Sequence, residues 1–317
     1  MAARMQTQNF ANLIKPGLRK VIISTLKDSP KEFRQLFNVI TGENPGGQSG
    51  RHYFDDLQVA PLGTYIALPQ GNAIQYDRIK EVGTVRYTPF AYALGARITH
   101  QMWVDELYSV MAKIYRLMAK SALHQMEVQA FRPLNFGFGT TGAGTGFTAA
   151  GYDALALFST AHPLARGGTA GNRATTDMDL SITAVEVLSD LMELTVDEAG
   201  MPDPRRPETI VVPPKLRWVA REITQSELKP YTGNNEVTPL GGSNPSPDYM
   251  VVHYLADEDS WFMRGTKADS DVNIWIREDP MYDAGDDFDT KDVKVSGMFR
   301  IASGHGDWRN WAGSQGA

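Results

Sequence analysis

The amino-acid sequence of 317 residues contains no cysteine, which excludes disulfide bonds, thiolate metal sites and cysteine nucleophiles. It has no apolar run approaching the roughly 18–20 residues that a transmembrane helix needs, and its N-terminus lacks the apolar core of a signal peptide. A basic excess is also missing, because 31 basic residues stand against 37 acidic ones and the net charge is −6. Proteins that read nucleic-acid sequence usually carry a basic surface, so this class is disfavoured.

The composition that remains is typical of a globular protein. Hydrophobic residues make up 42% of the chain and charged residues 21%, which is too apolar for a disordered chain. At roughly 150 residues per domain, the length corresponds to about two domains. The sequence patterns follow one another as an arm, a hairpin, a long helix, a mixed segment and long strands.

Residues 1–50 are predicted to form an N-terminal arm that is broken by prolines and glycines. Ser29 and Pro30 are typical of a helix start, and one short amphipathic helix is expected to follow. Its apolar face is predicted to hold Phe33, Leu36, Phe37 and Ile40. A single helix cannot fold alone, so we expect Phe33 and Phe37 to pack on a surface of a neighbouring copy.

Residues 51–98 are predicted to be an extended hairpin, with short strands at 65–68, 74–79 and 84–87. Neither face of this hairpin is apolar enough to form a core, and a long hairpin is marginal in water unless it packs on another surface. That surface is either its own domain or a neighbouring subunit. The second interpretation makes the following side chains candidates for contacts between subunits: Tyr65, Ile74, Tyr76, Arg78, Lys80 and Arg86.

The clearest periodic pattern predicts a helix over residues 100–132. Apolar residues, Leu117 among them, recur at spacings of three and four from Trp103 onward, and no proline intervenes before Pro133. Thr99 is the expected N-cap. At 1.5 Å per residue such a helix would be about 50 Å long.

Residues 136–180 are rich in glycine and threonine and are predicted to be loops around a short strand at 154–158. After them, Thr183 and Glu186 are typical of a capping box, which predicts a helix with Val187 on its buried face.

A buried strand is predicted over residues 209–212, and two prolines then open a second helix. The loop 230–247 that follows contains two further candidate contact residues, Asn234 and Asn235.

From residue 248 onward the chain is predicted to be β-structure. A hairpin is expected between residues 250–254 and 261–264, and alternating apolar residues predict long strands over 272–277 and 293–301. An acidic loop, 279–291, is expected between the long strands. It is either a solvated loop, a metal site or a surface complementary to arginines of another copy. Its candidate contact residues are Asp283, Asp286 and Asp287.

Motifs for catalysis, cofactor binding or metal binding are not found. The glycine-rich stretch 142–146 lacks the preceding strand and following helix that a phosphate-binding loop needs. The six histidines have no ligand spacing, so no catalytic residue, cofactor or metal ion is expected.

Several stretches resemble, in wording and in order, the major capsid protein family of tailed bacteriophages, which has the Hong Kong 97 fold. These stretches are residues 154–164, Asn172 with 179–181, 210–216 with Ala220, 254–257 with Trp261, and 304–309. The resemblance spans nearly the whole chain.

The resemblance implies an α+β capsid fold. Residues 1–50 would form the N-terminal arm and 51–98 the region of the extended hairpin called the E-loop. Residues 99–135 and 261–317 would form the peripheral P-domain, with its long spine helix and strands, and 136–260 the α/β axial A-domain.

The function implied is that of a major capsid protein. Its copies would self-assemble as hexamers and pentamers into an icosahedral phage head around double-stranded DNA, without a catalytic role. The implied location is the virion, with assembly in the host bacterial cytoplasm. Scaffolding, portal and decoration proteins are further expected partners, no membrane is, and packaged DNA would be held only by weak, non-specific proximity. The alternatives are a nanocompartment shell of the same fold, a nucleotide- or metal-dependent enzyme, and a tail or decoration protein.

Overall fold

The structure is a computed structural model that describes residues 31–42, 51–99, 101–102, 105, 110–142, 144–226, 247–287, 289–290 and 292–316. Its elements are α2 (Glu32–Leu36), β1 (Asn38–Thr41), β2 (Phe54–Ala60), β3 (Lys80–Tyr87), β4 (Phe90–Ile98), α4 (Val110–Ala130), α5 (Arg132–Asn135), β5 (His162–Pro163), β6 (Thr169–Ala170), α6 (Ile182–Glu193), β7 (Thr209–Val212), η2 (Pro214–Leu216), α7 (Arg217–Gln225), β8 (Asp248–Val251), β9 (Trp261–Arg264), η3 (Lys267–Asp269), β10 (Val272–Asp286), β11 (Val293–His305) and β12 (Trp311–Ser314).

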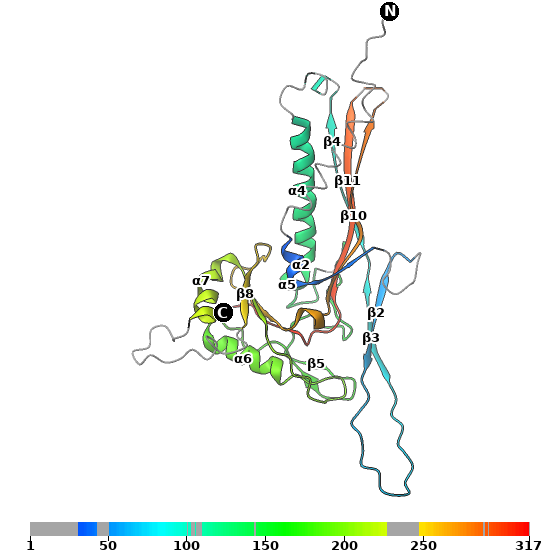
Figure 1. Ribbon diagram of the computed structural model, residues 1–317, viewed down its shortest axis with the longest axis vertical. Helices are drawn as coiled ribbons and strands as arrows, with labels where there is room; N and C mark the ends of the chain where they lie inside the picture. The colour runs from blue at the N-terminus through cyan, green and yellow to red at the C-terminus, as the bar shows by residue number, and fades with distance from the viewer. Residues whose placement is uncertain are drawn as a thin grey trace, which may run out of the picture.

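The longest strands form one sheet, in the order β1-β10-β11-β4. β10 and β11 pair antiparallel, β4 continues on the other side of β11, and β1 from the arm pairs parallel with β10. The long helix α4 lies along one face of this sheet (Figure 1). The long alternating strands predicted from the sequence are confirmed. Alternation places their apolar side chains on one face of the sheet, and α4 and the core cover that face.

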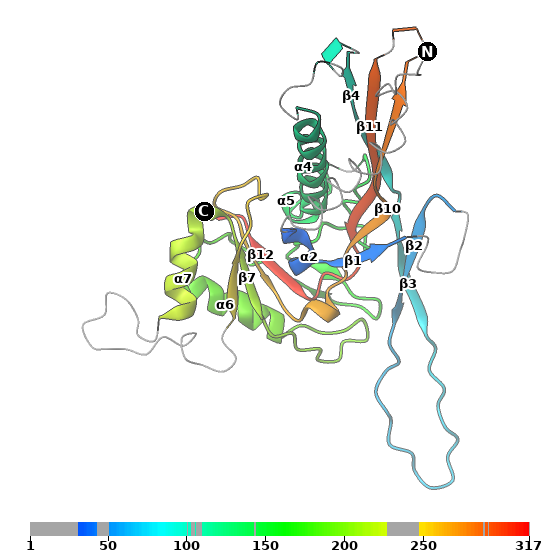
Figure 2. The ribbon, with the colours of Figure 1, turned by 45° about the horizontal axis from the view of Figure 1, so that its top comes forward.

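A second sheet has the order β12-β9-β7-β8 and carries α6 and α7 (Figure 2). β7 is the predicted strand 209–212, and Ile210, Val211 and Val212 are fully buried. The predicted hairpin between residues 250–254 and 261–264 is wrong, because β8 pairs with one side of β7 and β9 with the other. A strand as apolar as β7 needs neighbours on both sides, and these two segments supply them.

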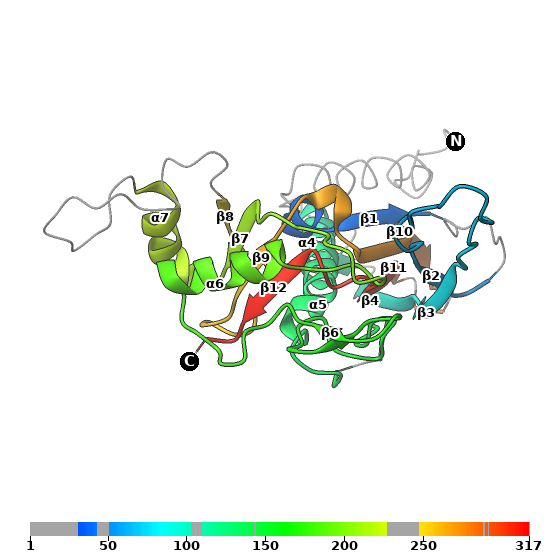
Figure 3. The ribbon, with the colours of Figure 1, turned by 90° about the horizontal axis from the view of Figure 1, so that it is seen from below.

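One buried hydrophobic cluster joins the two sheets, because it contains Trp275 of β10 together with Phe262 of β9. Phe158 stacks on Phe262 of β9 with ring centroids 5.2 Å apart, and Phe37 lies 5.7 Å from the ring of Trp311 on β12. Seen from below, the second sheet lies on one side of α4 and the β2–β3 hairpin on the other (Figure 3). The hairpin is therefore attached at a side of the body opposite to the second sheet.

The long helix is confirmed over Val110–Ala130 and differs from the prediction at its C-terminal end. Thr99 accepts a hydrogen bond from the backbone N–H of Met102, as expected of an N-cap, but residues 103–104 and 106–109 lie outside the described residues. α4 ends at Ala130, and Pro133 belongs to the separate short helix α5. The described helix is therefore about 31 Å long. Leu117, which was predicted on the core face, is exposed.

The mixed segment also departs from the prediction at three positions. No strand forms at 154–158, where Ala154 has a φ of 61° that is incompatible with an extended strand. α6 starts two residues earlier than the capping box predicted, because the hydroxyl of Ser181 caps it by accepting from the N–H of Ala184. Val187 is consequently turned outward, and Val185 is buried in its place.

The described part of the arm folds back on its own chain. α2 has only five residues, and Ile40 lies in β1, not on the helix. The predicted cap at Ser29 and Pro30 lies outside the described residues. The backbone changes from helix to strand at Phe37, which lets β1 pair with β10.

Candidate functional site

The most conspicuous feature of the chain is a hairpin that projects from the body (Figure 1). β2 and β3 pair antiparallel from Phe54 opposite Tyr87 to Ala60 opposite Lys80. Beyond that pair, residues 61–79 run out and back without strand pairing, so the predicted strands at 65–68 and 74–79 do not form within one chain. The two arms of this loop, which we call the tip loop, are extended but lack ladder partners.

The tip loop exposes large apolar side chains. Tyr65 is fully exposed and Tyr76 is 91% exposed. The other large apolar side chains exposed on the loop are Leu62, Ile66, Leu68, Ile74 and Ile79. Exposed apolar side chains gathered on one loop are typical of an interaction site, because covering each aliphatic side chain would contribute about 1.5–3 kcal/mol.

The root of the hairpin is fixed to the body, unlike the tip loop. Val85 and Tyr87 are buried in the central core. The side-chain amide of Gln58 donates a hydrogen bond of 2.9 Å to Asp271. At Gly83 any Cβ would lie 2.5 Å from the carbonyl oxygen of Tyr152, so the strand passes too close to the body for another residue type. A fixed root determines the direction in which the loop projects.

An ion pair tethers the tip loop to the body. A carboxylate oxygen of Asp77 accepts hydrogen bonds from the backbone N–H of Gly63 at 2.7 Å and from the guanidinium of Arg166 at 2.5 Å. Arg166 belongs to the turn between β5 and β6. The hydrogen bond from Gly63, followed by that from Arg166, lowers the pKa of Asp77 to about 2. Asp77 therefore stays ionised and joins both arms of the loop to the β5–β6 turn.

The other hairpin residues predicted from the sequence lie as follows. Arg78 is exposed on the tip loop and Lys80 is exposed at the start of β3. Arg86 forms a hydrogen-bonded ion pair of 2.7 Å with Asp55 across the hairpin, and its guanidinium lies 4.1 Å from the ring centre of Tyr53. Arg86 thus has partners within its own chain, which the sequence pattern did not predict.

The two arm residues in the predicted contact set are covered by their own chain. Phe33 and Phe37 are both fully buried in the central core. They leave no surface for a neighbouring copy, because the arm folds back onto α4 and β12. We therefore withdraw them from the set of candidate contact residues.

The acidic segment is mostly strand, not loop. Residues 279–286 continue β10, with Asp283 opposite Ser296 and the backbone of Asp286 opposite Val293. The carboxylate of Asp287 forms ion pairs with Lys294 at 2.6 Å and Arg97 at 3.8 Å. Cations of its own chain therefore occupy the position predicted for arginines of another copy.

Among these acidic residues, Asp283 is exposed, and the side chain of Asp286 lies outside the described residues. The loop residues Asn234 and Asn235 also lie outside them.

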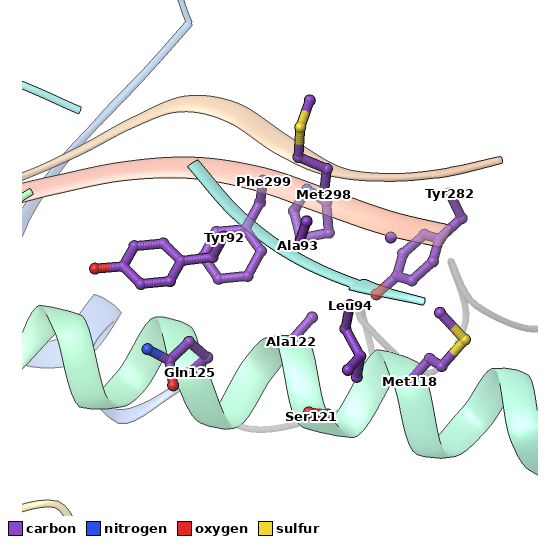
Figure 4. A pocket seen from close by; sticks show the side chains of 12 residues that line it. Tyr92, Ala93, Leu94, Met118, Ser121, Ala122, Gln125, Tyr282, Met298 and Phe299 are labelled. Carbon is purple, nitrogen blue, oxygen red and sulfur yellow. The ribbon is translucent and has the colours of Figure 1, made fainter. Parts of the chain in front are cut away.

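A shallow groove of about 210 Å³ lies between α4 and the long sheet. Figure 4 shows Tyr92 toward one end of the groove and Tyr282 and Met118 toward the other, with Leu94 between them. Its lining is largely apolar, with Ser121 and Gln125 contributed by α4. Sequence reasoning missed this groove because it forms only where a helix and a sheet that are distant in sequence meet.

Two pairs of buried polar groups in the body have structural partners. Nδ1 of His162 lies 2.5 Å from a carboxylate oxygen of Asp153, and its ring stacks on Trp308 at 4.2 Å. Arg309 and Glu198 form a buried ion pair of 2.6 Å. Among the described residues, no group of three or more metal-ligating side chains occurs, and no helix is both long and apolar enough to cross a membrane.

The comparison with protein families decides the interpretation of this architecture. Residues 81–313 match the model of a family described as phage capsid protein. The chain belongs to the phage capsid protein family. No curated protein matches this phage capsid protein.

Solved structures of low sequence identity share its fold. The capsid of the cyanophage P-SCSP1u is 10% identical, with a TM-score of 0.58 over 91% of this chain and 88% of that chain. The capsid of the native GTA particle is 12% identical, with a TM-score of 0.57 over 91% of each chain. The virus-like particle from Pyrococcus furiosus is 11% identical, with a TM-score of 0.51 over 94% of this chain and 97% of that chain.

Family and fold together confirm two expectations from the sequence. The α+β fold is that of the Hong Kong 97-like capsid proteins, and the chain is a major capsid protein, a structural subunit that self-associates into the shell of a virion.

Proposed function

We propose that copies of this capsid protein assemble as hexamers and pentamers into an icosahedral head around double-stranded DNA, and that the tip loop of each copy crosses its neighbour. The observation that carries this proposal is the exposure of Tyr65, Ile74 and Tyr76 on a loop without strand partners. A neighbouring copy would cover these side chains, and large obligate interfaces commonly bury some 2,000–5,000 Å².

The proposed anatomy follows the division expected from the sequence. Residues 1–50 act as the arm, 51–98 include the E-loop, 99–135 with 261–317 form the P-domain, and 136–260 form the A-domain. β4 lies within the E-loop region in sequence but pairs with β11 of the long sheet, which favours moving residues 90–98 to the P-domain.

Contacts around the rotation axes would involve the loop 230–247, and contacts between capsomers would involve Asp283 and its neighbours. Because such contacts are heterologous and repeat around an axis, they close into rings and then into a shell. Assembly in the host bacterial cytoplasm, with separate scaffolding, portal and decoration proteins, completes the proposal.

The test is a variant that keeps the fold but removes the apolar side chains of the tip loop. In the triple variant Tyr65→Ser, Ile74→Ser, Tyr76→Ser, we expect the chain to fold but to fail to form shells. A matched control, Gln70→Ser with Asn72→Ser, changes polar residues of the same loop and is expected to assemble normally. Electron microscopy and sedimentation measure assembly, and circular dichroism measures folding.

Shells formed by the triple variant as efficiently as by the unchanged chain would refute the role of the tip loop. A chain that stays monomeric at every concentration, alone and in the presence of its phage's other proteins, would refute the shell itself.

A further inference from the structure

The exposed face of α4 carries an unusual concentration of basic side chains. Lys113, Arg116 and Lys120 are all exposed. Their spacing of three and four residues places them within one stripe along the helix. The exposed neighbours of the stripe, Leu117 and Ser121, are neutral. We call Lys113, Arg116 and Lys120 the α4 basic stripe.

The stripe has no acidic partner among the described residues. Several other basic residues of the chain pair with carboxylates, as Arg97 does with Asp292 and Arg173 with Asp177. Glu127 is the only acidic residue of α4, and its carboxylate is buried beneath α2. The stripe is therefore positive in a chain whose net charge is −6.

The basic character continues beyond the helix. α2 lies against the end of α4 where Glu127 accepts the backbone N–H groups of Glu32 and Phe33 (Figure 1). The chain that leads into α2, residues 1–31, contains six basic residues and only one acidic residue, Asp28. The segment of sequence that leads to this end of α4 is therefore net positive.

We propose that the α4 basic stripe binds the phosphate backbone of double-stranded DNA without sequence preference. This inference rests on the proposed function, in which the shell encloses DNA. Three cations along about 10 Å of helix axis face a duplex that carries one negative charge per roughly 1.7 Å. A long, straight helix without acidic side chains on its exposed face meets a polyanion without repulsion, and contacts to phosphates alone carry no sequence information.

Duplex DNA is favoured over an acidic protein because the three cations follow one straight line along the helix, and a regular row of positive charge matches the evenly spaced phosphates of a duplex. Leu117 is the only large apolar side chain among the described exposed residues of the stripe's face. A few phosphate contacts per copy are individually weak, yet the same contact repeated over a shell would hold DNA against the shell wall.

The test measures DNA binding by the purified full-length chain, kept unassembled by low concentration. Fluorescence anisotropy of a short labelled duplex is recorded over a range of NaCl concentrations. Arg116→Gln with Lys120→Gln is expected to reduce the slope of log K against log salt concentration by about 2, because each phosphate contact contributes roughly 0.9. The matched control, Arg217→Gln with Arg221→Gln, removes the same charge from exposed positions of α7 and is expected to leave the slope unchanged.

Two results would overturn the proposal. Equal reductions in both double variants would mean that DNA responds only to net charge, and no reduction in either would mean that the stripe does not bind phosphate. A third arm uses poly-L-glutamate as the ligand. Binding tighter than that of the duplex, and lost in the α4 variant alone, would assign the stripe to an acidic protein instead.

Electron microscopy of the same variants separates this inference from the proposed function. If the α4 variant forms shells normally and its salt slope equals that of the unchanged chain, DNA binding by the stripe is refuted and the proposed function is not. An unchanged chain that binds duplex through the stripe but never forms shells would refute the proposed function and leave the stripe intact.

Discussion

The rings of Phe37 and Phe131 pack edge to face, with their centroids 5.3 Å apart. Phe37 follows α2 in the arm and Phe131 follows α4, so this contact holds the arm against the end of the long helix. Trp311 of β12 also packs against Phe37, which ties the C-terminal strand to the same cluster. The arm segment 31–42 is therefore part of the core of its own chain.

Replacing Phe37 by alanine should destabilise the unassembled chain. Removal of a fully buried phenylalanine leaves a cavity and costs about 3–5 kcal/mol of the free energy of unfolding. Urea unfolding of the unassembled chain measures this. Tyr65→Ala is the control, because an exposed side chain contributes less than about 0.5 kcal/mol. An unfolding free energy that Phe37→Ala leaves unchanged would return Phe37 to the set of inter-subunit contacts.

Glu127 should make the stability of the chain depend on pH. Burial raises the pKa of Glu127 from its ordinary value of 4.5 to about 7, against the lowering effect of the hydrogen bonds from the N–H groups of Phe33 and Glu32. The folded chain thus binds a proton that the unfolded chain releases. The resulting stabilisation is fully present below pH 4.5 and is lost as the pH rises through 7.

The measurement is the free energy of unfolding between pH 4.5 and 8, for the unchanged chain and for Glu127→Gln. The unchanged chain should lose on the order of 1–3 kcal/mol more than the variant over this range. Asp271, whose pKa is also raised by burial to about 6, contributes a similar dependence to both and cancels in the comparison. Parallel pH curves would show that Glu127 does not titrate in this range.

Breaking the tether between Asp77 and Arg166 should release the tip loop without unfolding the body. In Arg166→Gln, hydrogen exchange of the backbone amides in 61–79 is expected to accelerate, while the melting temperature stays unchanged because the ion pair is on the surface. Arg173→Gln removes a comparable ion pair with Asp177 and should leave exchange in the tip loop as it was. If both variants exchange like the unchanged chain, the tether does not order the loop.

Replacing one partner of the buried pair Glu198–Arg309 should lower the free energy of unfolding much more than replacing both partners. Arg309→Met leaves the carboxylate of Glu198 buried without its cation, which is expected to cost about 3–5 kcal/mol of unfolding free energy. Adding Glu198→Gln should recover part of that loss, as a double-mutant cycle by chemical denaturation would show. Strict additivity of the two substitutions would mean that the groups do not interact.

The hydrophobic patterns predicted the elements whose burial is set by period alone. The runs that became β10, β11 and α4 alternate or repeat with the period of their own secondary structure, β7 is a short continuous apolar run, and each was placed correctly in outline. Pairing was harder to predict. Residues 250–254 and 261–264 carry equally good strand patterns, yet β7 separates them, because strand order depends on a third segment that is distant in sequence.

The candidate contact residues also divide into those whose exposure the sequence predicted and those whose partners only the tertiary structure showed. Tyr65, Ile74 and Tyr76 were predicted to be exposed for a neighbour, and the structure places them on the tip loop. Asp287 finds its cation in Lys294 of the facing strand. The groove beside α4 had no sequence signal, since its walls are far apart in the chain.

The sequence by itself determined which apolar side chains favour burial, because alternation and helical spacing put them on one face of each element. Only the tertiary structure decided what covers them. Phe37 and Tyr76 are both large aromatic side chains, but other parts of its own chain cover Phe37 and leave Tyr76 exposed. A side chain is buried only where another surface packs against it, and which surface does so depends on how distant segments of the chain pack together.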